Sequence, residues 1–215
     1  MASSVKYHLD ELSIALDPDD PRHCFPVMSG TPERVLDIGC GIGQFYLAGR
    51  FNGNVFYVGL DIDIEPMIFG KRHWDRMNYV KAGGASLPFR PLFFDFVVSR
   101  GTLHLTNLPT AVTEIARVME KGARVWMSMH SFSMQWKKLI NYALKLHYKG
   151  FLFMSYVLLN GLCFHCFGKV FPFFLPGKYE SFQTAKSMTK LLKSCGFSDI
   201  KITTGRHFVV TAVKS

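Results

Sequence analysis

Apolar runs alternate with helical stripes along most of this chain, and this alternation predicts an α/β fold. Apolar runs at 35–38, 54–60, 94–99 and 123–129 predict buried strands. Residues 108–119 predict a helix, with Ala111, Ile115 and Val118 on one face, and residues 120–122 predict its end. Further along, a helix over 185–195 is predicted to precede a hairpin of residues 199–204 and 207–213.

The first predicted strand runs into glycines at alternate positions, Gly39, Gly41 and Gly43. Such a loop can turn sharply and bring the free N–H groups of the following helix close to a ligand. A dinucleotide-binding fingerprint would place its third glycine one residue later, where this chain has Gln44. The spacing therefore favours a different nucleotide-type cofactor over a nicotinamide.

The segment Val35-Leu-Asp-Ile-Gly-Cys-Gly-Ile-Gly43 resembles the first motif of the class I S-adenosylmethionine-dependent methyltransferases, and the chain is similar to their type 11 group. Asp61, after the second strand, and the Phe-Asp-Phe-Val-Val-Ser run at 94–99 resemble later motifs of that family. The resemblance covers 34–129 and 185–215. It implies a Rossmann-like, seven-stranded, mostly parallel sheet with helices on both faces and an antiparallel last strand.

We expect the chain to divide into four segments. Residues 1–33 are expected to form a helix and loop that cover the cofactor site, and residues 34–130 the cofactor-binding core. Residues 131–184 are expected to form a helical lid insertion, rich in basic and aromatic residues, and residues 185–215 to complete the sheet.

The resemblance implies S-adenosylmethionine as the cofactor and assigns roles at the glycine loop. Asp37 is expected to reach the methionine ammonium or its bound water, the glycines to admit the methionine portion, and Asp61 to accept both ribose hydroxyls. Where family members often carry an acidic residue for the adenine amino group, this chain has Gly84, so backbone groups are expected to replace it. The expected cofactor contacts are Asp37, Gly39, Cys40, Gly41, Gly43, Asp61, Ile62, Gly84, Ala85 and Arg100.

Two histidines, His104 and His130, follow the strands at 94–99 and 123–129 and are the candidate catalytic residues. Ligands of open α/β sheets bind at the carboxyl ends of the strands, and an imidazole there can accept a proton from a hydroxyl or ammonium. A structural role for either ring is the alternative. Tyr179 and Glu180 are expected either to orient a substrate or to anchor the lid. No metal is expected, because Cys163 and Cys166 supply only half of a zinc site.

The charge of the chain is concentrated in its last third. Residues 131–215 carry 12 Lys and Arg against two acidic residues, whereas residues 1–130 are nearly balanced. An amphipathic helix is predicted over 135–149, with its apolar side packed on the sheet or on an anionic membrane. The aromatic run at 151–175 is interrupted by polar residues, glycine and proline, so a lid is expected there rather than a spanning helix. Peripheral membrane contact through 135–175 remains an alternative.

These observations favour a methyltransferase for a small, hydrophobic molecule such as a lipid, a quinone or an aromatic metabolite, because an apolar lid suits such an acceptor. An RNA-directed methyltransferase is an alternative, favoured by the basic C-terminal third and disfavoured by the lack of a recognisable RNA-binding module. A non-catalytic cofactor-binding scaffold is the third hypothesis. Five thiols and a start without a leader-like pattern predict a cytoplasmic location, with membrane association as the alternative.

Overall fold

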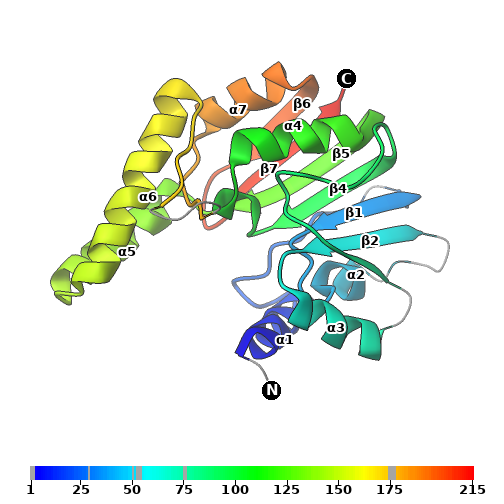
Figure 1. Ribbon diagram of the computed structural model, residues 1–215, viewed down its shortest axis with the longest axis horizontal. Coiled ribbons are helices and arrows are strands. Elements are labelled where there is room, and N and C mark those ends of the chain that lie inside the picture. Colours follow the sequence, from blue (N-terminus) through cyan, green and yellow to red (C-terminus); the bar gives the residue numbers. More distant parts are fainter. Residues whose placement is uncertain (1–2, 29, 50, 52–54, 75–76, 174–177) are drawn as a thin grey trace.

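In the computed structural model, the described residues form one seven-stranded sheet in the order β3-β2-β1-β4-β5-β7-β6 (Figure 1). The described residues are 3–28, 30–49, 51, 55–74, 77–173 and 178–215. The strands are β1 (Arg34–Ile38), β2 (Phe56–Asp61), β3 (Asn78–Lys81), β4 (Phe94–Arg100), β5 (Met119–Met129), β6 (Phe197–Thr203) and β7 (Phe208–Lys214). β7 pairs antiparallel with β5 and β6. The predicted Rossmann-like sheet with an antiparallel last strand is therefore confirmed.

Alternate side chains of the central strands enter two separate cores, as the two-residue period of a strand requires. Leu36 and Ile38 of β1 pack on one face, with helices α4 (Leu108–Val118) and α7 (Ala185–Ser194). Val35 packs on the other face, with Phe45 of α2 (Gln44–Gly49). Figure 1 shows α4 and α7 on one side of the sheet and α2 and α3 (Ile64–His73) on the other. The predicted covering of both faces by helices is confirmed.

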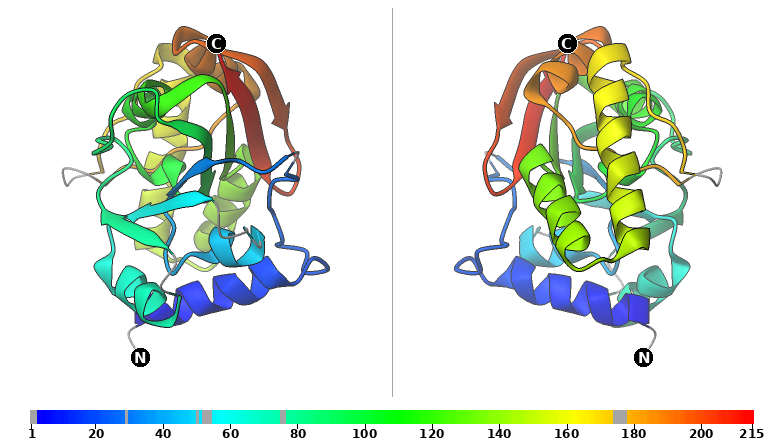
Figure 2. Two further views of the ribbon diagram at one scale, coloured as in Figure 1. Left: turned by 90° about the vertical axis from the view of Figure 1, so that its right-hand side faces the viewer. Right: turned by 90° about the vertical axis from the view of Figure 1, so that its left-hand side faces the viewer.

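Helix α1 (Ser3–Leu16) lies beside α2 and α3 (Figure 2). The Ser4 hydroxyl donates a hydrogen bond to the Asp63 carboxylate at the start of α3. Nδ1 of His8 lies 2.8 Å from Nε2 of Gln44, the first residue of α2. The N-terminal helix is thus attached to the two helices that follow β1 and β2.

Residues 132–167 form a hairpin of two helices, α5 (Phe132–Leu144) and α6 (Tyr148–Phe167) (Figure 2). The helix predicted over 135–149 is corrected at both ends: it begins at Phe132 and ends at Leu144, because Leu146 adopts a positive φ of 49° in the connecting turn. Its apolar side is not packed on the sheet: Trp136 and Ile140 are exposed, whereas the polar Gln135 is buried.

Helix α6 is continuous over 20 residues, so its polar residues and glycines do not interrupt it. Gly161 is accommodated because the Phe182 ring packs against it, where a Cβ would lie 2.1 Å from Cδ1 of that ring. Within the described ranges, α6 is the helix whose length and composition would allow it to cross a membrane, and 28% of its apolar window is buried. Residue 54 of the predicted second strand and residues 174–177 of the predicted lid lie outside the described residues.

Strand β5 begins four residues before the predicted start, at Met119, which pairs with Phe94 of β4. The predicted helix stop at 120–122 therefore lies within β5, where the register with β4 shifts and Gly122 has a φ of 80°. At their carboxyl ends, β4 is followed by a short 3-10 helix, η1 (Leu103–Leu105), and β5 by α5. These two connections supply the histidines of the candidate site.

Candidate functional site

The glycine loop after β1 has the left-handed backbone that favours glycine. Gly39, Gly41 and Gly43 have φ values of 81°, 54° and 99°. A Cβ on Gly39 would lie 2.0 Å from Oγ1 of Thr102, the residue that precedes η1. The loop after β1 and the segment after β4 are therefore in direct contact, and a side chain at position 39 would separate them.

Asp61, at the end of β2, holds the glycine loop through its carboxylate. Oδ2 accepts a hydrogen bond from the Gly41 N–H at 2.9 Å, and Oδ1 accepts one from the Asp63 N–H at 3.0 Å. An ionised carboxylate offers about four lone-pair positions, so two acceptor positions remain for ligand hydroxyls. Ile62 beside it is 72% exposed and offers an apolar surface at the same edge.

Asp37 is buried in β1 on the face that carries Tyr57. The Tyr57 hydroxyl donates a hydrogen bond to Oδ2 of Asp37 at 2.7 Å. Burial raises the pKa of Asp37 to about 7, and the Tyr57 hydrogen bond partly opposes this rise. A carboxyl group that is half-protonated near neutral pH would gain stability from a cationic partner such as an ammonium group.

The other expected cofactor contacts lie around the same edge of the sheet. Arg100 forms an ion pair with Glu11 of α1 at 2.7 Å, and its guanidinium lies over the Phe25 ring. Gly84 is buried, with the place of its absent Cβ 3.2 Å from Ile38, and Ala85 is half-buried. Cys40 is buried, and burial holds the pKa of its thiol well above the usual range, so the sulfur acts as an apolar filler.

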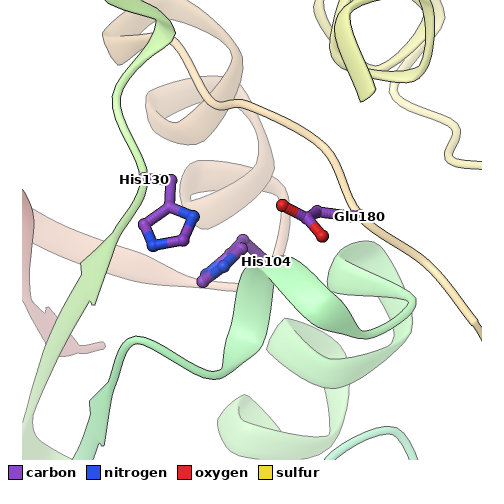
Figure 3. A group of neighbouring side chains, drawn as sticks. All are labelled: His104, His130 and Glu180. Carbon is purple, nitrogen blue, oxygen red and sulfur yellow. The ribbon is translucent and has the colours of Figure 1, made fainter. Parts of the chain in front are cut away.

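The two candidate catalytic histidines are brought together, and a carboxylate joins them (Figure 3). His104 comes from η1, His130 follows β5, and Glu180 lies on the segment that leads into α7. One ligand atom of each residue lies within 4.8 Å of the others, and the two imidazole centroids are 4.0 Å apart. His104 is 1% exposed, and neither of its ring nitrogens has a hydrogen-bond partner among the described residues.

Two buried amides position this cluster. Nε2 of Gln135 donates a hydrogen bond to Glu180 Oε1 at 3.1 Å and lies 3.3 Å from Nδ1 of His130. Nδ2 of Asn160 in α6 donates to the Glu180 carbonyl oxygen at 2.9 Å. The helical hairpin therefore holds Glu180 on both its side chain and its backbone.

Burial determines the charge of the cluster. It lowers the pKa of His130 to about 4 and holds the pKa of His104 well below its ordinary value, with the Lys138 charge acting in the same direction. Burial also raises the pKa of Glu180. Both imidazoles are therefore neutral at physiological pH. Neutral rings offer lone pairs to a hydrogen-bond donor or a cation, but with such low pKa values they are weak bases.

Residues 36–127, which hold the glycine loop, Asp61 and His104, match the family model described as a methyltransferase domain. This chain carries a class I S-adenosylmethionine-dependent methyltransferase domain. The O-methyltransferase rstn1 of Aspergillus nomiae is 27% identical over 100 residues, which are 43% of this chain and 44% of that protein. The malonyl-[acyl-carrier protein] O-methyltransferase of Erwinia billingiae is 30% identical over 114 residues, which are 50% of this chain and 45% of that protein.

The fold of the methyltransferase domain is shared with solved structures. A S-adenosylmethionine-dependent methyltransferase of Methanosarcina mazei superposes with a TM-score of 0.54 at 22% identity, covering 89% of this chain and 98% of that one. The chain spans less than half of the length of the curated relatives that it matches. Similarity to those relatives is confined to about half of this chain, and the family match ends before His130 and Glu180.

Sequence reasoning missed the two amides of this candidate site. Gln135 begins the helix that the sequence predicts over 135–149, and Asn160 is one of several polar positions within the aromatic run at 151–175. Isolated polar residues in apolar helices are the available signal, because a buried amide is retained where it has partners to bind. The sequence does not show which partners these are, since Glu180 is 20 residues from Asn160.

Proposed function

We propose that this protein transfers the methyl group of S-adenosylmethionine to a small, hydrophobic molecule. The observation that carries the proposal is the contact between the two halves of the site. Thr102 packs against Gly39 of the cofactor loop, and His104 follows it by two residues in the same turn. A donor held by the loop and an acceptor held by the histidines would therefore be neighbours.

The donor side of this proposal fits the residues present. The remaining lone pairs of Asp61 suit a pair of ribose hydroxyls, and the exposed Ile62 suits the face of an adenine. The buried carboxyl of Asp37 suits the methionine ammonium, which would favour its ionised form. The proposed donor contacts are Asp37, Gly39, Cys40, Gly41, Gly43, Asp61, Ile62, Gly84, Ala85 and Arg100.

His104 and His130 are the proposed catalytic residues, because they are the rings that would face the accepting atom. Bound S-adenosylmethionine supplies an electrophilic methyl carbon on a positively charged sulfur. The residues of this chain contribute alignment and exclusion of water, since methyl transfer in line depends more on geometry than on acid–base strength. The buried position of His104 and the helical hairpin beside it provide a water-poor environment.

The acceptor is proposed to be apolar apart from its reacting atom. The elements that join the histidine cluster are rich in aromatic residues. The rings of Phe132 in α5 and Phe182, in the segment that carries Glu180, meet edge to face, and Phe164 is buried in α6. Such surroundings suit a hydrophobic molecule with one polar group directed at the histidines. The location proposed for the protein is the cytoplasm, in contact with a membrane surface.

The test is incubation of the purified protein with methyl-labelled donor and a cell extract, followed by separation of lipid, aqueous and RNA fractions. Label in the lipid fraction or in apolar small molecules is the expected result. Label in RNA alone would overturn the proposal in favour of an RNA-directed enzyme. Donor binding without label in any fraction would favour a non-catalytic scaffold.

A further inference from the structure

We propose that His104, His130 and Glu180 bind a divalent transition-metal ion. The three side chains come from separate segments of the chain and lie side by side, with one ligand atom of each within 4.8 Å of the others (Figure 3). Imidazole and carboxylate are the ligand pair that zinc and iron(II) sites use in proteins. The metal site itself is independent of the proposed function, which enters only in what the ion would do there.

The environment of His104 is the second observation that favours a ligand. Its ring is 1% exposed, and neither nitrogen has a partner among the residues that the structure describes. Buried polar groups in proteins are nearly always satisfied, so such a ring calls for a partner that is not part of the described chain. An ion between His104, His130 and Glu180 would give one nitrogen of the His104 ring its partner.

The spacing suits an ion of this class. Two ligands bound tetrahedrally to zinc at about 2.1 Å lie about 3.4 Å apart, so ligand atoms that lie within 4.8 Å of one another need to approach by about 1.4 Å at most. Gln135 and Asn160 supply the supporting hydrogen bonds that usually orient metal ligands. Three protein ligands leave a coordination position open, as in catalytic metal sites. In the proposed reaction, the accepting atom would occupy that position.

The test is titration of the full-length protein with Co²⁺ after removal of metals by chelation. Visible absorption follows the coordination of Co²⁺, and equilibrium dialysis gives the stoichiometry. One ion per chain is expected. Glu180→Gln and His130→Asn are each expected to weaken binding about tenfold or more, with folding checked by circular dichroism. The control is the double variant Cys163→Ser, Cys166→Ser, which removes both thiols of α6 and should bind Co²⁺ as the wild type does.

Absence of Co²⁺ binding to the folded wild type would overturn the inference. Binding that survives Glu180→Gln and His130→Asn but is lost in the cysteine double variant would also overturn it. Calorimetry with S-adenosylmethionine separates this failure from failure of the proposed function. Donor binding without metal binding would leave the methyltransferase proposal intact, whereas metal binding without donor binding would remove that proposal alone.

The exposed face of the helical hairpin carries a second, independent inference: we infer that α5 and α6 dock on an anionic membrane surface. Trp136, Ile140 and Leu144 recur every four residues along α5 and are all exposed. Leu146, in the turn between the helices, and Leu152 of α6 are exposed as well. Contiguous exposed apolar patches of this kind mark interaction sites.

The positive charge of the hairpin favours an anionic lipid surface as its partner. Residues 131–179 contain six lysines and no acidic residue. Lys137, Lys145 and Lys149 are exposed next to the apolar surface. Basic helices with an aromatic and aliphatic face bind anionic lipid, where each cation near the surface adds to the attraction. A second copy of this chain is disfavoured as the partner, because it would bring the same positive charges to the contact.

The other face of α6 favours surface docking over insertion across the bilayer. Met154, Asn160 and Phe164 are buried against the rest of the protein. The side-chain amide of Asn160 donates hydrogen bonds to the carbonyl oxygens of Phe171 and Glu180. Surrounding α6 with lipid would break these contacts. Contact through the exposed face alone leaves them intact and brings the proposed acceptor site next to a source of hydrophobic molecules.

Sedimentation with vesicles tests this inference. The protein is expected to bind vesicles of phosphatidylcholine mixed with phosphatidylglycerol, and to bind pure phosphatidylcholine at least about tenfold more weakly, with binding reduced by salt. Leu144→Asp combined with Leu146→Asp should abolish binding. The control Val27→Asp changes a fully exposed apolar residue outside the hairpin and should have no effect. Failure to bind anionic vesicles at low salt, or self-association abolished by the double variant, would overturn the inference.

Discussion

The Tyr57 hydroxyl donates a hydrogen bond to Asp37 across 2.7 Å in the interior of the protein, where both side chains are buried. The bond joins β2 to β1 on the face opposite the larger core. A carboxyl group in such a place destabilises the fold once it ionises, and one hydrogen bond only partly offsets its loss of solvation. Asp37 is therefore better explained by a ligand than by stability.

Asp37→Asn is expected to stabilise the ligand-free protein at alkaline pH. Because burial raises the pKa of Asp37 from 3.8 to about 7, the folded state binds this proton more tightly than the unfolded state. The contribution of Asp37 to the free energy of unfolding is complete below about pH 4. It is lost as the pH rises to about 7, by up to about 4 kcal/mol. The melting temperature of the variant should exceed that of the wild type at pH 8 and approach it at pH 5. A variant that is less stable than the wild type by the same amount at both pH values would contradict this expectation.

Asp61→Ala is expected to weaken the binding of S-adenosylmethionine about tenfold or more. The change removes the ribose acceptor and leaves the Gly41 N–H without its partner. Calorimetric titration measures the effect. Asp63→Asn is the matched control, since Asp63 caps α3 and its side chain bonds Ser4 rather than the glycine loop. Equal affinities for the Asp61 variant and the wild type would refute the placement of the ribose.

Gly39→Ala is expected to destabilise the fold more than Gly101→Ala. Both glycines have a positive φ, so both variants carry the cost of about 1 kcal/mol for a left-handed residue. A Cβ at position 39 also meets Thr102, whereas nothing lies within 4 Å of one at position 101. The additional loss should be about 1–3 kcal/mol in urea denaturation. Thr102→Ala should restore part of it, and equal losses in the two glycine variants would show that the contact is unimportant.

Glu11→Gln is expected to loosen α1 from the site. The ion pair between Glu11 and Arg100 is partly buried and joins the N-terminal helix to the end of β4. Its loss should increase amide hydrogen exchange in α1 and speed the release of the donor, because α1 lies over the glycine loop through His8. Glu33→Gln, which changes an acidic residue outside the helix, is the control. Unchanged exchange in α1 would show that the ion pair does not hold the helix.

Local sequence determined the sheet and the residues of the proposed donor half of the site. The two-residue alternation of β1 and β4 and the helical stripe of α4 are complete within a few residues, so their elements follow from the order of side chains alone. The same holds for the glycines at 39, 41 and 43 and for the acidic residue after β2, because each is recognised from its immediate neighbours in the sequence. The ends of the lid helices were less predictable, since Leu146 turns the chain without a glycine or proline to mark the place.

Only the tertiary structure decided which side chains meet at the proposed acceptor half. His104, His130 and Glu180 come from three segments, and no local pattern relates a residue of η1 to one 76 positions later. The outward direction of the apolar residues of α5 is also a tertiary property. An amphipathic pattern fixes that a helix has an apolar face, whereas the packing of the other elements decides whether that face is covered or exposed.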